Sequence, residues 1–170
     1  AWEIEMATPR TWKESVELLR IGALQVDAAP DGIDLQGPLF NLGGTFGVIT
    51  KDNQLPTDSM GARMTQQSYR EIMAATPAHV VQVSDGNART DQLAAGARWL
   101  RLNLAATARG LSLHPVSQAL QEYPEMAGPH ARIHDLYARP GQTVQMLGRL
   151  GYGPEIPRTP RWRLEEKLAR

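Results

Sequence analysis

Two arginines near the end of the chain, Arg161 and Arg163, flank Trp162 and follow a stretch rich in proline. Prolines stiffen an extended backbone, and side chains two residues apart on extended backbone point to the same side. Two guanidinium groups placed in this way can hold one phosphate, and each charge-assisted hydrogen bond contributes about 1.5–3 kcal/mol. The segment therefore predicts a phosphate-binding pair.

The charge balance leaves other interpretations of this basic end. The chain has 18 Lys and Arg against 18 Asp and Glu, but residues 1–85 hold 6 basic and 11 acidic side chains, and residues 86–170 hold 12 and 7. The basic end could instead be a solvated tail, or it could dock onto the acidic half of its own chain. Because the rest of the chain is neutral to acidic, no nucleic-acid partner is expected.

A second segment that could do chemistry consists of Pro115, Val116, Ser117 and Gln118, where an apolar run meets a proline. Proline cannot donate to a strand ladder, so a strand that ends here leaves backbone N–H groups pointing outward. Such donors could hydrogen-bond a planar ring rich in heteroatoms. A plain turn from strand to loop is the alternative.

Other kinds of site are poorly supported. His130 and His134 are four residues apart, as zinc ligands on a helix can be, but no Glu base and no third ligand accompany them, so no metal is expected. The chain lacks the nucleophile elbow, the phosphate loop and the dinucleotide fingerprint. With no cysteine it has no thiolate nucleophile or disulfide, and the compartment stays open. No side chain is expected to be catalytic.

The elements that must position these segments differ between the two halves. In the first half, apolar spacing predicts one helix from Pro9 to about Asp27, a loop over 27–37, a short helix running into extended chain over 38–50, and a helix over 59–75. In the second half, β-branched and apolar runs predict strands over 79–83, 111–117 and 142–152. Glycines at 148 and 151 would permit a bulge or a close backbone approach in the last strand.

Helices are predicted over 90–109 and 123–138, and the first of these is expected to be the core helix through Leu93, Leu100 and Leu104. The fold class expected is α+β, with a mixed, largely antiparallel sheet packed against helices. No stretch approaches the roughly 18 apolar residues of a spanning helix, so no membrane partner is expected.

Several of these segments together carry a resemblance to a known family. They are LRLNLAATARGLSLHPVSQ at 100–118, YPEM at 123–126, VQMLGRLGYGP at 144–154 and PRWRLEEKL at 160–168. Their combination resembles the C-terminal half of the nitroreductase-like FMN-binding proteins, in particular the Acg-like branch, whose members fuse two such halves. Residues 9–37, with the wording PDGIDL, are similar to the same branch. The resemblance covers nearly the whole chain.

The resemblance implies one nitroreductase-like domain over residues 1–170, the C-terminal half of a longer fused protein, that holds FMN at an interface. Backbone groups at Pro115, Val116, Ser117 and Gln118 would contact the flavin ring near N5 and O4, and Arg161 and Arg163 would bind the ribityl phosphate. The implied activity passes hydride or electrons from NAD(P)H to a nitroaromatic or quinone-like acceptor. The alternative is a protein that binds and sequesters the flavin without catalysis.

The chain departs from the family pattern at one point. An arginine-rich phosphate motif with a serine normally stands near the start of the first half, and Pro9-Arg10-Thr11-Trp12 does not match it. The flavin site would therefore be completed by a second nitroreductase-like half or by a homodimer partner.

Overall fold

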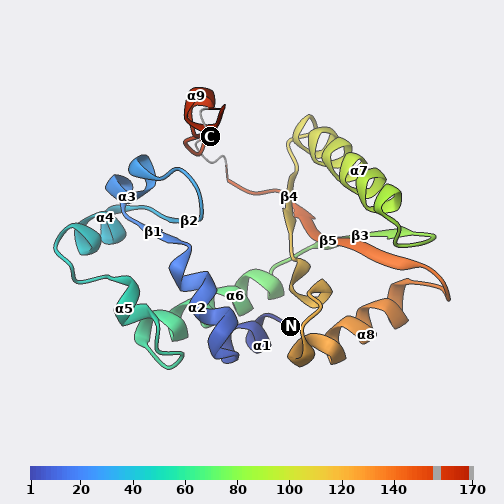
Figure 1. The fold of residues 1–170 in the computed structure, drawn as a ribbon, viewed down its shortest axis with the longest axis horizontal. Helices are drawn as coiled ribbons and strands as arrows, with labels where there is room; N and C mark the ends of the chain where they lie inside the picture. Colours follow the sequence, from blue (N-terminus) through green and yellow to red (C-terminus); the bar gives the residue numbers. More distant parts are fainter. Residues whose placement is uncertain (155–157, 169–170) are drawn as a thin grey trace. The chain divides into compact units, whose positions relative to one another are not determined.

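The structure, a computed structural model, describes residues 1–154 and 158–168. The chain forms two compact units: unit 1 holds Ala1–Glu5 and Ser68–Glu155, and unit 2 holds Met6–Gln67 and Ile156–Arg170. Helices and an antiparallel sheet make the fold α+β, which confirms the expected class (Figure 1). The expectation of one domain over residues 1–170 stays a prediction.

Unit 1 is built on a three-stranded antiparallel sheet in the order β3-β5-β4, with β3 at Ala78–Ser84, β5 at Thr143–Gly151 and β4 at Ser112–Pro115. The three predicted strands are therefore confirmed. The register of the β3–β5 pair shifts between Gln82 and Val83 on β3, and not at a glycine of β5 as expected. Gly148 instead permits a close approach, because a Cβ there would stand 2.5 Å from the Trp99 ring.

Helix α7, Arg89–Thr107, covers one face of this sheet (Figure 1). Its predicted boundaries are nearly right, but the expected core stripe is wrong: Leu93, Leu100 and Leu104 are 60%, 60% and 61% exposed. A second apolar stripe faces the sheet instead, with Ala95 and Ala106 buried and Trp99 between them. These positions also recur at helical spacing, and their alanines let the helix lie close to the strands.

The remaining elements of unit 1 follow β4. The 3-10 helices η1, Ser117–Leu120, and η2, Pro124–Met126, lead into α8, Ala127–Tyr137. The helix predicted over 123–138 therefore begins as a 3-10 turn. Met126 is fully buried at the junction, so this turn is part of the core.

Unit 2 is mainly helical. Its elements are α2 Pro9–Glu17, β1 Leu19–Ile21, α3 Ala23–Ala28, β2 Ile33–Leu35, α4 Pro38–Thr45, α5 Lys51–Gln54, most of α6 Met60–Ala74, and α9 Leu164–Leu168. The short helix α1, Trp2–Ala7, begins in unit 1. The helices predicted near residues 38 and 59 are confirmed.

Three predictions for unit 2 are wrong. The chain expected to be extended before residue 50 forms a turn over 46–49, and α5 lies where a break was expected. The expected helix over 9–27 is interrupted by β1, which pairs in parallel with β2 inside the expected loop. Gly22, at φ +79°, separates β1 from α3. Val16, Ile21 and Val26 are still buried, so the apolar spacing marked core positions but not the backbone conformation that carries them. Among the described residues no helix is long and apolar enough to span a membrane.

Candidate functional site

The face of the unit 1 sheet opposite α7 carries a row of basic side chains. Strand register pairs Arg149 on β5 with His79 on β3 and with His114 on β4. Side chains of directly paired residues lie on the same face of an antiparallel sheet, so the three form one row. The C-terminal part of α6 lines the same face, and a hollow lies on each side of this row.

One of these hollows, here called the aromatic hollow, has a volume of about 400 Å³. It joins four stretches of chain that are distant in sequence. Its lining includes Trp2, Tyr69, Arg70, His79, Val116 and Gln118. The hollow therefore contains two of the residues that the sequence selected at the strand end.

A stacked aromatic pair forms one wall of the aromatic hollow. The rings of Trp2 and Tyr69 are 4.2 Å apart between centroids and within 5° of parallel. Beside them Arg70 forms an ion pair with Glu3, with 2.7 Å between Nη2 and Oε1. The wall is thus aromatic and flanked by an ion pair.

Tyr69 also links this wall to the strand end. Its hydroxyl donates to Oε1 of Gln118 at 3.3 Å. Burial, and next the negative charge of Glu5, raise the pKa of Tyr69 above its usual value of 10.0. The phenol therefore stays protonated and keeps this bond near neutral pH.

The strand end itself is partly as expected. Pro115 ends β4, Ser117 is exposed, and Gln118 is half-buried in the aromatic hollow. Val116 is buried, and its N–H donates to the carbonyl of Leu147 at 2.9 Å. The expectation of an outward-pointing N–H is therefore wrong at Val116, because the hydrogen-bonding pattern continues one residue beyond the proline.

The basic pair lies in unit 2, in a segment without regular secondary structure. Nη1 of Arg161 donates to Oγ1 of Thr159 and to the carbonyl of Pro160, and Arg161 lines a hollow of about 150 Å³ together with Asp31 and Asp34. Arg163 is exposed. The sequence predicted that these two arginines and the strand end around Gln118 bind one ligand. The arginines belong to unit 2 and the strand end to unit 1.

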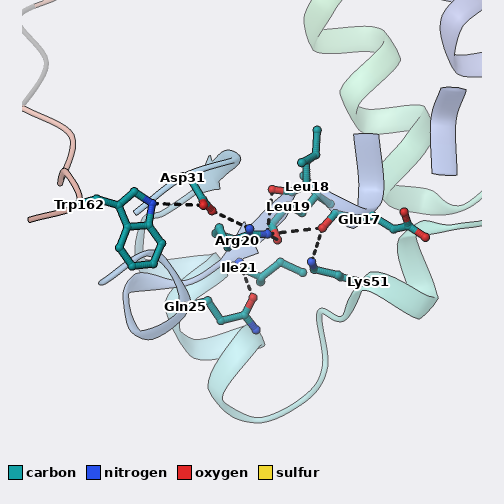
Figure 2. Close-up of polar contacts among 9 residues, drawn as sticks. All are labelled: Glu17, Leu18, Leu19, Arg20, Ile21, Gln25, Asp31, Lys51 and Trp162. Atoms are coloured by element: carbon teal, nitrogen blue, oxygen red, sulfur yellow. Dashed lines mark hydrogen bonds and ion pairs between the residues drawn. The ribbon is translucent and has the colours of Figure 1, made fainter. Parts of the chain in front are cut away.

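Between the two arginines, Trp162 contacts the acidic half of the chain. Its Nε1–H donates to Oδ2 of Asp31 at 3.2 Å, and Lys167 Nζ lies 4.2 Å from the centre of the Trp162 ring. Arg20 binds the other oxygen of Asp31 at 2.7 Å (Figure 2). The C-terminal segment therefore contacts an acidic residue of the first half through Trp162. This is the docking that the charge asymmetry raised as an alternative.

The network around Asp31 is electrostatically consistent. The hydrogen bond from Arg20 is the largest cause and lowers the pKa of Asp31 below 3.8. Desolvation, the next largest, opposes it, and the Trp162 hydrogen bond adds a smaller lowering. Arg20 also donates to the carbonyls of Glu17, Leu18 and Leu19, where α2 gives way to β1 (Figure 2). The network therefore ties the C-terminal segment to the first strand.

The histidine pair on α8 has a structural role. Nε2 of His134 accepts from the N–H of Val144 on β5 at 3.2 Å, and its Nδ1 lies 2.9 Å from the carbonyl of His130. Both ring nitrogens of His134 therefore have partners within the chain. No group of three metal-ligating side chains occurs in residues 1–154 and 158–168.

Sequence reasoning missed the aromatic wall. Trp2 and Tyr69 are 67 residues apart, and neither belongs to a recognisable motif. Only the fold brings them together beside Gln118. Local spacing could have flagged each as an aromatic on a helix, but not their contact.

Comparison with known proteins adds no relative. No family model matches the chain, and neither a curated protein nor a solved structure matches it.

Proposed function

We propose that the chain is an FMN-dependent oxidoreductase of nitroreductase type, with the flavin ring bound in the aromatic hollow of unit 1. When bound, FMN supplies the hydride and electron transfer from NAD(P)H to a nitroaromatic or quinone-like acceptor. The observation that carries the proposal is that the strand end around Gln118 shares one hollow with the parallel rings of Trp2 and Tyr69. The family resemblance selected that strand end independently of the hollow.

The hollow fits a planar heteroaromatic ligand in size and chemistry. Its volume of about 400 Å³ lies in the range of small-molecule sites, roughly 300–1,000 Å³. Its wall offers an aromatic surface, which favours stacking of flat rings. Gln118 uses its Oε1 to accept from Tyr69, which leaves its amide N–H groups to donate to a ring oxygen or nitrogen.

An exposed ion pair between Arg70 and Glu3 lies at the rim of the hollow, and both residues line it. The guanidinium N–H groups that do not bind Glu3 can donate to a ring oxygen or nitrogen. The chain's own contribution is therefore orientation and hydrogen bonding, with no side chain required as acid or base.

The same proposal assigns the ribityl phosphate to Arg161 and Arg163. This part rests on the resemblance and on the chemistry of paired guanidinium groups. Arg163 has no ion pair with a described residue, so its charge is available for an anion. The flavin ring and its phosphate can be tested separately, because riboflavin lacks the phosphate.

The decisive experiment compares FMN with riboflavin on the full chain. Flavin fluorescence quenching should give tighter binding of FMN than of riboflavin. Tyr69→Leu should weaken both by about tenfold, because it removes the aromatic wall. Arg161→Ala with Arg163→Ala should remove only the preference for FMN.

A matched control removes two arginines elsewhere. Arg132→Ala with Arg139→Ala, at two exposed positions of unit 1 outside the aromatic hollow, takes away the same charge and should leave flavin binding unchanged. If the two double variants behave alike, the phosphate assignment is wrong. Consumption of NAD(P)H with a quinone acceptor then separates the enzyme from a protein that only sequesters flavin.

The proposal includes a partner, either a second nitroreductase-like half or a second copy, and α7 offers a surface for it. Leu93, Ala97, Leu100 and Leu104 recur at spacings typical of paired helices, and the three leucines are exposed. In an antiparallel pair Leu93 can face Leu104 of a second copy, and Ala97 can face Leu100. We therefore expect a homodimer, which light scattering should detect and which Leu100→Glu should dissociate. If the chain is monomeric, the homodimer is excluded and a second nitroreductase-like half remains as the partner.

A further inference from the structure

A second hollow, here called the basic hollow, lies on the same sheet face as the aromatic hollow. Its volume is about 300 Å³. The polar side chains that line it come chiefly from β4 and β5, and among the described residues no aspartate or glutamate lines it. Its lining includes Ser112, His114, Arg149, Ile72, Pro77 and Leu150.

Arg149 is held in place at this hollow without an anionic partner. Its Nε–H donates to Nδ1 of His114 at 3.2 Å, across the strand pair in which the two residues face each other. The side chain is half-buried. Among the described residues its two terminal amino groups have no carboxylate or carbonyl partner. A partly buried guanidinium in this situation has lost water without gaining a counter-charge, so an anion stabilises it.

His114 completes a set of donors around this charge. Because its Nδ1 accepts from Arg149, the neutral ring carries its proton on Nε2, which can donate. Burial, and next the charge of Arg149, lower the pKa of His114 below 6.5 and favour this neutral form. Ser112 lies two residues earlier on β4, on the same face, and adds a hydroxyl donor.

We propose that the basic hollow binds a phosphate monoester carried on an apolar or aromatic body. Three donor side chains, one of them charged, match the three terminal oxygens of a phosphate monoester better than the two of a carboxylate. Ile72, Pro77 and Leu150 give the rest of the hollow an apolar lining that suits such a body. The basic hollow shares no lining residue with the aromatic hollow, and neither Arg161 nor Arg163 lines it.

The test is an NMR titration of the full chain with inorganic phosphate and, separately, with phenyl phosphate. Both should shift the Arg149 Nε–H and His114 ring signals, and phenyl phosphate should bind several-fold more tightly because of the apolar lining. Arg149→Met should weaken binding of either ligand by at least about tenfold. Ser112→Ala should weaken it by a few-fold.

Arg109→Met is the matched control. Arg109 also has one hydrogen bond within the chain, to the carbonyl of Ala105, and lies outside the hollow. It should leave both affinities unchanged, while circular dichroism confirms that the Arg149 variant is folded. The proposal is overturned if the two variants weaken binding equally, if the His114 signals do not move, or if inorganic phosphate binds as tightly as phenyl phosphate.

Discussion

Arg20 in unit 2 and Arg149 in unit 1 are both shielded arginines near a strand, yet their surroundings differ in kind. Arg20 is bound to the Asp31 carboxylate and to three backbone carbonyls, and its side chain is 20% exposed. Arg149 is bound to a neutral imidazole. Arg20 therefore has its counter-charge within the chain, whereas Arg149 does not.

The difference separates an arginine that stabilises the fold from one that is available to a ligand. Removing Arg20 would take a donor from the carbonyl of Leu19 and from Oδ1 of Asp31, and unsatisfied groups are costly. The carbonyls of Glu17 and Leu18 would keep Lys51 and the N–H of Ile33 as donors. Removing Arg149 would leave only the Nδ1 of a partly solvated ring. Loss of Arg20 is therefore expected to lower the stability of the fold, whereas loss of Arg149 is expected to weaken ligand binding.

The largest expected effect is that of Arg20→Ala. It should lower the free energy of unfolding by about 2 kcal/mol, because it removes the Asp31 ion pair and the carbonyl contacts at the start of β1. Urea unfolding followed by fluorescence measures this. Arg63→Ala, which removes a single contact to the carbonyl of Asp58, should cost clearly less. Equal losses would contradict the assigned role of Arg20.

A smaller effect is expected from Trp162→Phe, which keeps an aromatic ring but removes the donor to Asp31. The pKa of Asp31 should rise toward its ordinary value of 3.8, though less than in Arg20→Ala, because Arg20 is the larger cause of the lowering. Carboxyl NMR titration of the two variants measures the order. A larger rise in the tryptophan variant would show that the C-terminal segment, and not Arg20, dominates this site.

The basic hollow should make stability depend on pH. The pKa of His114 is lowered in the folded chain, so the unfolded chain takes up the proton first as pH falls below 6.5. This contribution is complete above pH 6.5, decreases below it, and levels off once the folded ring is also protonated. Unfolding curves from pH 7.5 downward should therefore show a slope that His114→Gln reduces. An unchanged slope in that variant would exclude His114 as the cause.

The smallest effect on stability is expected from Arg149→Met. Methionine keeps much of the apolar stem, so the free energy of unfolding should change by no more than about 0.5 kcal/mol in the absence of anions. Urea unfolding beside the Arg20 variant gives the contrast directly. A loss as large as that of Arg20→Ala would remove the distinction between the two arginines.

Local signals in the sequence were sufficient for the strands of unit 1. Prolines, glycines and β-branched runs bounded them, and the turn before α7 was marked by Asp85-Gly86-Asn87. The strand β1 was missed because its apolar residues continue the helical spacing of α2. What ends the helix there includes the side chain of Arg20 and pairing with β2, both of which depend on residues farther along the chain.

The candidate site was only half predictable for the same reason. Gln118 could be selected because it follows a proline that ends a strand. The stacked pair of Trp2 and Tyr69 could not, since contact between two separate helices depends on tertiary packing. The wrong stripe on α7 has a related cause, because two apolar stripes share that helix and the sequence alone favoured the larger leucines over Ala95 and Ala106.

The N-terminal residues at the rim of the aromatic hollow have a practical consequence. Ala1 and Glu3 line it together with Trp2, so any residue joined before Ala1 leaves the chain at its mouth. An affinity tag fused to that end would compete with small molecules for entry. Ligand screening therefore calls for removal of any such tag.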